Sequence, residues 1–193
     1  RNITYLDNFL KAQAQKYGED HVKAMIVPNA VEILKDKLPD YAVAEEEGNY
    51  LREIRTQIPE KLFFDAEPIL EAHKEEPIYY KTDHHWKTLA ARYVYEAWAD
   101  SIGLPIVPIS EYREETLTED FHGTIDAKVN IKIPGDSIEC YKPVTEIPYT
   151  LTYNHSEERT SLYDDSYLEG RDKYAVFFGG NQPLIEARTR AVS

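Results

Sequence analysis

Tyr79-Tyr80-Lys81-Thr82-Asp83-His84-His85-Trp86 is the stretch in which the pattern of the chain changes from one element to the next. Residues 77–80 form a short apolar run, which predicts a buried strand. From residue 89 onward, apolar side chains recur at three- and four-residue steps, which predicts a helix that ends at Ser101. Asp83 and His85 therefore lie in a loop between a strand and a helix, where functional side chains of α/β proteins collect.

Asp83 and His85 have a chemistry that suits general base catalysis. An imidazole titrates near neutral pH, and a carboxylate bonded to one ring nitrogen fixes its tautomer and stabilises its cation. Such a pair can activate a serine hydroxyl. Two other interpretations stay open on spacing alone. In one, Asp83 caps the helix and a histidine packs in the core. In the other, residues 83–85 bind a metal with distant partners, such as His73, His122 or His155.

The rest of the chain divides into an alternating part and a β-rich part. Helices are predicted over residues 3–16, 29–38, 49–58 and 66–73, and short apolar strands over residues 22–27 and 62–65. This alternation predicts a parallel sheet with crossover helices. After Leu104, short runs punctuated by prolines predict hairpins, at residues 129–133, 137–141 and 149–153, and residues 173–178 return as an apolar strand. We expect one α/β domain over residues 1–193, with an antiparallel β insertion at about 104–172.

The octet, above all Thr82-Asp83-His84-His85-Trp86, resembles the signature of the DHHW protein family. That family is similar to the SGNH-hydrolase-like O-acetyltransferases, such as the alginate acetyltransferases of the bacterial envelope. The resemblance implies a flavodoxin- or SGNH-hydrolase-like sandwich built on a parallel sheet. It also implies a Ser-His-Asp triad in which Asp83 is the orienting acid and His85 the general base, with Trp86 packed behind them. The implied activity is acyl transfer by a carbohydrate O-acetyltransferase or esterase.

Further site residues follow from the same resemblance. Gly179-Gly180-Asn181 looks like the Gly-Gly-Asn segment found late in DHHW proteins. Backbone N–H groups in a glycine turn and an asparagine amide can stabilise an oxyanion, so Gly180 and Asn181 are the expected donors, with a plain β-turn as the alternative. His84 and Asn29 are expected to contact substrate, although Asn29 also suits a turn or helix cap.

The serine nucleophile is less evident than the other two members of the triad. Gly135-Asp136-Ser137 matches the Gly-Asp-Ser block of SGNH enzymes in letters, but a nucleophile elbow needs a strand before it and a helix after it. An alternating strand follows here, so Gly135-Asp136 is predicted to form a hairpin turn and Ser137 is a poor candidate. In the relatives the nucleophile follows a later apolar strand. We therefore expect it beyond Ser193, in a chain truncated at its C-terminus; a non-catalytic binding or assembly module is the alternative.

Composition restricts the classes of partner. The net charge is −13, from 35 acidic and 22 basic residues, so the surface repels phosphate backbones and nucleic acid is not expected as a partner. The sequence contains no dinucleotide-binding fingerprint or phosphate-binding glycine loop, and no cofactor or metal is expected. The resemblance implies an envelope polysaccharide or other glycan as substrate and an acyl-donor membrane protein as partner. It also implies an extracytoplasmic or membrane-anchored location, with an N-terminal signal or anchor removed before Arg1.

Overall fold

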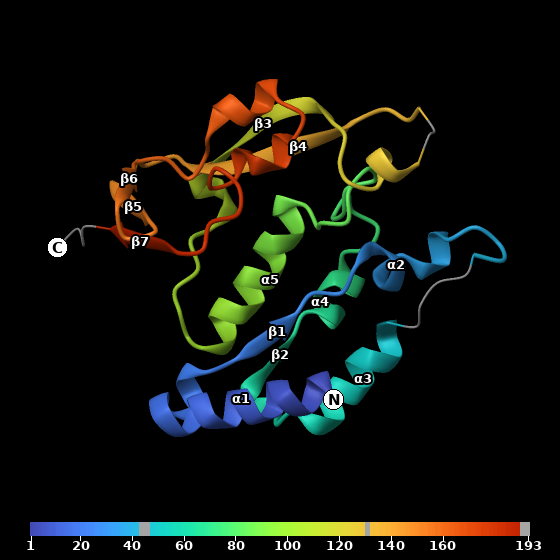
Figure 1. The fold of residues 1–193 in the computed structure, drawn as a ribbon, viewed down its shortest axis with the longest axis vertical. Helices are drawn as coiled ribbons and strands as arrows, with labels where there is room; N and C mark the ends of the chain where they lie inside the picture. The colour runs from blue at the N-terminus through green and yellow to red at the C-terminus, as the bar shows by residue number, and fades with distance from the viewer. Residues whose placement is uncertain (43–46, 130–131, 190–193) are drawn as a thin grey trace. The chain divides into compact units, whose positions relative to one another are not determined.

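The computed structural model describes residues 1–42, 47–129 and 132–189. The chain forms two compact units. The first unit contains residues 1–79 and 89–106, and the second contains residues 80–88 and those from 107 onward. Each unit has its own elements and its own buried cluster, and each is described by itself below (Figure 1).

The first unit carries the alternating pattern of strands and helices. Its elements are α1 (Asn2–Tyr17), η1 (Glu19–His21), β1 (Ala24–Ile26), α2 (Ala30–Ile33), η2 (Lys35–Lys37), α3 (Glu47–Gln57), η3 (Glu60–Leu62), β2 (Phe63–Asp65), α4 (Glu67–Ala72) and α5 (Thr88–Ser101), whose first residue belongs to the second unit. Strands β1 and β2 pair in parallel, with Ala24 opposite Phe63. In Figure 1, α1 and α3 lie to one side of this strand pair and α5 to the other. The helices predicted at 3–16, 49–58 and 66–73 and both predicted strands of this part are thus confirmed. The helix predicted over 29–38 is instead the short α2 followed by η2, and the parallel sheet of the described residues has two strands.

The first helix illustrates how the sequence builds this unit. The apolar side of α1 packs into a buried cluster with the end of α3 and the segment before β2, formed by Leu10, Ala14, Ile54, Ile58 and Leu62. Burial of such side chains contributes about 1.5–3 kcal/mol each. The helix ends at Gly18, whose φ of 94° is a conformation that glycine adopts without steric cost. The Gly18 N–H donates to the Ala14 carbonyl at 2.8 Å.

The second unit is built from antiparallel strands and short 3₁₀ turns. Its elements are η4 (Ile109–Glu111), β3 (Tyr112–Phe121), η5 (Asp126–Lys128), β4 (Asp136–Pro143), β5 (Tyr149–Tyr153), β6 (Glu157–Arg159), η6 (Asp165–Glu169), η7 (Lys173–Val176) and β7 (Ile185–Thr189). Strands β3 and β4 pair antiparallel, and β5 lies between β6 and β7 in a second antiparallel sheet. The hairpin pattern after Leu104 therefore does mark antiparallel strands. Side chains from β3, β4 and the η7 segment form the buried cluster of this unit, with Tyr80, Phe121, Ile138 and Val176 at its centre.

Three local predictions were wrong: two concern apolar runs predicted as strands, and one concerns a predicted turn. Residues 78–80 are buried and Pro77 is exposed, and residues 77–80 form no named strand. Residues 173–176, predicted as part of a strand, form the 3₁₀ helix η7, because the Phe177 N–H donates to the Tyr174 carbonyl at 3.2 Å and closes a tight turn. Asp136, predicted in a hairpin turn, is the first residue of β4 and is buried there. The expected strand at 129–133 lies in part on residues 130–131, outside the described ranges.

Within the described ranges, none of the helices combines the length and the apolar character needed to cross a membrane.

Candidate active site

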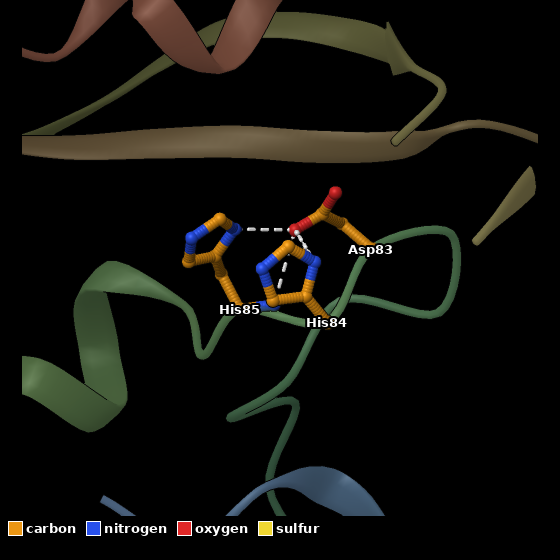
Figure 2. Close-up of side chains that lie close together, drawn as sticks. All are labelled: Asp83, His84 and His85. Atoms are coloured by element: carbon orange, nitrogen blue, oxygen red, sulfur yellow. Dashed lines mark hydrogen bonds and ion pairs between the residues drawn. The ribbon is translucent and has the colours of Figure 1, made fainter. Parts of the chain in front are cut away.

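The segment between Tyr80 and α5 places Asp83 and His85 side by side in the second unit. Asp83 is 3 % exposed, and its Oδ1 accepts two hydrogen bonds from His85. The backbone N–H donates at 3.0 Å and the ring Nδ1 lies at 2.5 Å (Figure 2). With Asp83 ionised, Nδ1 carries the proton, so the lone pair of the neutral ring is on Nε2. The predicted pairing of an orienting carboxylate with an imidazole is present in the geometry.

The second oxygen of Asp83 is fixed just as firmly. Oδ2 accepts hydrogen bonds from the Thr124 backbone N–H at 2.7 Å and from the Thr124 hydroxyl at 3.0 Å. Burial raises the pKa of Asp83, but the bonds from Thr124 and His85 outweigh burial and hold this pKa below its ordinary value. Asp83 is therefore a buried, ionised carboxylate whose hydrogen bonds, among the described residues, come from Thr124 and His85, with Nδ1 of His84 also 3.5 Å from its Oδ1.

The contact between Thr124 and Asp83 is possible because the backbone at Gly123 lies close to the Asp83 side chain. At Gly123 a Cβ atom would overlap the Asp83 carboxyl group, so only glycine leaves room for the carboxylate to reach the next residue. The Gly123 N–H itself donates to the Thr82 hydroxyl at 3.1 Å. The turn after β3 and the loop that carries Asp83 are thus fitted to each other at two successive residues.

Asp136 is a site-supporting residue that the sequence analysis missed. It is 7 % exposed, and one carboxylate oxygen, Oδ2, accepts from the Lys81 N–H at 2.9 Å and from both the N–H and the hydroxyl of Thr82 at 2.7 Å. These bonds fix the two residues that precede Asp83. The sequence offers only an acidic residue next to Ser137 at the start of an alternating run, and nothing in it pairs that residue with Thr82.

His84 and His85 differ in exposure and in partners. The His84 side chain is 60 % exposed, and its Nδ1 lies 2.8 Å from the Thr124 hydroxyl. The His85 side chain is 38 % exposed, and its ring lies 4.0 Å from that of His84 and 4.2 Å from that of Tyr174, centroid to centroid. Trp86, expected behind the pair, is half-buried. Tyr174 is a second residue that the sequence analysis did not assign to the site, because residues 173–178 were interpreted as a strand.

The predicted oxyanion donors lie in a glycine turn directly after η7. Gly179 and Gly180 have φ values of 67° and 83°, which explains two adjacent glycines. The Gly180 N–H donates to the Phe177 carbonyl at 3.2 Å, so this group already has an acceptor within the turn. The Gly180 N–H is thus bonded within the turn, and Asn181 lies at the surface.

Asn29 and Ser137 each have a local partner that accounts for their side chains. Asn29 lies in the first unit and caps α2, since its Oδ1 accepts from the N–H of Val31 at 2.9 Å. Ser137 lies on β4, where its hydroxyl bonds to the Glu139 carboxylate and lies 3.4 Å from Nζ of Lys87. Lys87 in turn forms an ion pair with Glu139 at 3.1 Å. Among the described residues, the Ser137 hydroxyl bonds to this ion pair and not to His85.

The metal interpretation of the segment has a limited basis in the geometry. Asp83, His84 and His85 each offer a ligand atom within 4.8 Å of the others. Nδ1 of His84, Nδ1 of His85 and both carboxylate oxygens of Asp83 already take part in hydrogen bonds. The distant histidines that were considered as further ligands are paired elsewhere in the described structure: His73 with Glu76, His122 with Asp120 and Asp126, and His155 with Glu186. The convergence on Asp83 is therefore better described as a hydrogen-bonded network.

The α/β fold and its motif define an SGNH hydrolase-like protein. A family model described as "SGNH hydrolase-like domain, acetyltransferase AlgX" matches residues 9–167, and the chain belongs to this family. The predicted resemblance to DHHW proteins and SGNH-like O-acetyltransferases is confirmed by this match and by similar solved structures. A comparison with curated protein sequences found no match.

Three solved structures illustrate the shared fold. A DHHW family protein from Eubacterium siraeum has a TM-score of 0.68 and 24 % identity, over 96 % of this chain and 65 % of that chain. Bacillus cereus PatB1 with a sulfonyl adduct has a TM-score of 0.63 and 20 % identity, over 95 % and 63 %. The O-acetyltransferase domain of Pseudomonas putida AlgJ has a TM-score of 0.54 and 18 % identity, over 76 % and 57 %. The chain thus spans less than two thirds of the length of each of these structures.

Proposed function

We propose that this chain forms part of an acyl-transfer enzyme, a carbohydrate O-acetyltransferase or esterase of the bacterial cell envelope, with Asp83 and His85 as its acid–base pair. The observation that carries the proposal is the 2.5 Å contact between Nδ1 of a partly exposed histidine and a buried carboxylate. That arrangement leaves Nε2 as the proton acceptor and keeps the ring in one tautomer. Membership in the acetyltransferase family supports the same class of reaction.

The proposed reaction assigns a step to each residue. His85 Nε2 takes the proton of a serine hydroxyl as the serine oxygen bonds to the acetyl carbonyl carbon. His85 then returns that proton to the leaving group as the acyl–donor bond breaks, and Asp83 stabilises the intermediate imidazolium. A hydroxyl of the glycan or water attacks the acyl-serine by the reverse sequence. Asn181 is the proposed oxyanion donor, with Gly180 as the weaker alternative, and His84 and Asn29 are the proposed substrate contacts.

We propose that the serine comes from a segment that follows Ser193 in a longer protein. The hydroxyl of Ser137 is occupied by Glu139 and Lys87, and each of the three solved structures described above is longer than this chain. A sulfonyl adduct, as named for PatB1, is the product expected when a nucleophilic residue attacks a sulfonyl reagent. In this proposal residues 1–193 belong to one domain, in which further strands complete a parallel-sheet sandwich and the β-rich region is the antiparallel insertion.

The proposed substrate and location follow from the family rather than from a surface of the chain. An O-acetyltransferase of this family would use an envelope polysaccharide or other glycan as acceptor and a membrane protein as acyl donor. The protein would then act outside the cytoplasm, anchored or exported by an N-terminal segment that precedes Arg1.

The test is covalent labelling by a sulfonyl fluoride or fluorophosphonate, with the adduct mapped by mass spectrometry. We expect no adduct on residues 1–193 and one serine adduct on a C-terminally extended protein. The His85→Ala variant of the extended protein should lose the adduct, while His155→Ala, which removes an exposed histidine of the same unit, should keep it. An extended protein that stays unlabelled, or labelling that persists without His85, would refute the proposal. The first of these results would favour a non-catalytic glycan-binding or assembly module.

A further inference from the structure

The hydrogen bond to Asp83 does not by itself fix the His85 ring. The His85 side chain is 38 % exposed, and the second side-chain torsion of a histidine has broad, roughly two-fold minima. When the proton on the ring is exchanged during catalysis, an exposed imidazole can therefore turn away from its carboxylate. A ring that must return to the same position in each cycle needs contacts on its faces as well as on its edge.

Such contacts are present on His85. The Tyr174 ring stacks on the imidazole, with centroids 4.2 Å apart and planes 11° from parallel. The His84 ring lies 4.0 Å away, inclined by 35°. Among the described residues Tyr174 and His84 make no ring contact with each other, so the two rings lie on different sides of the imidazole. Rotation of the His85 ring about its second torsion would drive its edges into both neighbours.

Tyr174 is held more firmly than His84. Its ring packs at 5.3 Å from Phe177, at 6.2 Å from Phe121 and at 6.2 Å from Tyr80, within the buried cluster of the second unit. No hydrogen bond of its hydroxyl occurs among the described residues, so its contact with the site is made by the ring. Burial and the charge of Asp83 raise the pKa of Tyr174, which keeps the phenol neutral. Tyr174 is thus an anchored, uncharged surface for the imidazole.

We propose that Tyr174 is a positioning residue for the general base: its ring, anchored in the aromatic cluster and opposed by His84, holds the His85 imidazole with Nδ1 on Asp83 and Nε2 directed to the reacting hydroxyl. This inference rests on the proposed function, since it assigns Tyr174 to the machinery of that reaction. It also connects the site to the Gly179-Gly180 turn, because Tyr174 lies on η7 and the turn follows η7 directly.

Proton and ¹⁵N NMR of this chain tests the inference without an activity assay. A Nδ1 proton held between an imidazole and a carboxylate exchanges slowly with water and gives a separate downfield resonance. We expect this resonance in the wild type and in Tyr174→Phe, which keeps the ring. In Tyr174→Leu we expect its loss. Phe177→Leu is the matched control, because Phe177 packs in the same cluster and contacts Tyr174 but, among the described residues, not the His85 ring.

The outcomes separate the positioning role from the function on which it rests. The inference is supported if the downfield resonance is lost in Tyr174→Leu but kept in Phe177→Leu, and if the wild type shows nuclear Overhauser effects between the His85 and Tyr174 rings. The inference is overturned if the downfield resonance persists in Tyr174→Leu, or if Phe177→Leu loses the resonance to the same extent. If Tyr174→Leu does not fold, absence of the ring-to-ring effects in the wild type still overturns it. A wild type without the downfield resonance would remove the Asp83–His85 pair itself and with it both proposals.

Discussion

Substitution of Asp83 by asparagine tests the hydrogen-bond network at the residue on which its bonds converge. The carboxylate accepts four hydrogen bonds, two on each oxygen, from Thr124 and His85. An amide of the same shape keeps one accepting oxygen and replaces the other by an NH₂ group, which is a donor. Whichever way the amide turns, one backbone N–H, of His85 or of Thr124, then faces a donor at a buried position.

The cost of this substitution can be estimated from those bonds. A buried N–H without an acceptor costs about 1–3 kcal/mol, and the remaining bonds lose the strength that the carboxylate charge gave them. The Thr124 hydroxyl can rotate to accept from the amide, which offsets part of the loss. We therefore expect Asp83→Asn to lower the free energy of unfolding by about 2–4 kcal/mol. At a slope of about 2 kcal/mol per molar urea, the midpoint falls by about 1–2 M.

The pH dependence gives this prediction a second, independent measurement. Asp83 has a pKa below its ordinary value in the folded protein, whereas an unfolded aspartate has a pKa of about 3.9. Above about pH 5 both states are ionised and Asp83 contributes its full stabilisation. As the pH falls through about 4, Asp83 of the unfolded chain is protonated before Asp83 of the folded protein. The stabilisation is therefore lost progressively as the pH approaches the lower pKa of the folded state. The difference in unfolding free energy between wild type and Asp83→Asn should therefore shrink in acid.

Urea unfolding at pH 7 and at pH 3.5, followed by circular dichroism, measures both effects. Asp126→Asn is the matched control, because Asp126 lies on the same turn as Thr124 and forms a 3.2 Å ion pair with His122 that is only partly buried. Its substitution should change the unfolding free energy by less than about 1 kcal/mol. Equal urea midpoints for Asp83→Asn and wild type at pH 7 would refute a stabilising role for the hydrogen bonds to Asp83.

Two further predictions concern the residues that support the loop. Asp136→Ala leaves the partly buried N–H of Lys81 and the buried N–H and hydroxyl of Thr82 without their carboxylate, so the unfolding free energy should fall by about 2–5 kcal/mol; urea midpoints equal to those of wild type would contradict this. Gly123→Ala places a Cβ against the Asp83 carboxyl group and should cost about 1–3 kcal/mol, or roughly 3–10 °C in Tm. The same variant should lose the downfield Nδ1 resonance of His85. Gly103→Ala, which is strained by a φ of 69° but adds a Cβ that meets no neighbour, should keep it.

The sequence was sufficient for the elements of the first unit and for the pair at the centre of the site. Helical periodicity and short apolar runs predicted α1, α3, α5, β1 and β2, because each of these patterns is local. Asp83 and His85 are two residues apart in a loop, so their contact is also local. The family signature then supplied roles that spacing alone left open among a catalytic pair, a helix cap and a metal site.

The parts that could not be predicted depend on contacts between distant segments. Thr124 binds Asp83 across 41 residues, and Asp136 binds Thr82 across 54. A single sequence carries no signal for such pairings, since an acidic residue in a strand and a threonine in a turn have many ordinary uses. The interpretation of residues 173–178 failed for a related reason: an apolar run records that side chains are buried, and both a strand and a tight turn can bury them.

The exposure of His85 is the feature that a purely structural loop would not need. A histidine that packs in a core is buried, and a histidine that only caps a helix has no requirement for contacts on both faces of its ring. His85 is 38 % exposed, yet its edge is bonded to a 3 % exposed carboxylate and its faces lie against Tyr174 and His84. Burying that carboxylate costs free energy, which the bonds from Thr124 and His85 offset. The network thus holds a partly exposed ring in one orientation, which is what the proposed general base requires.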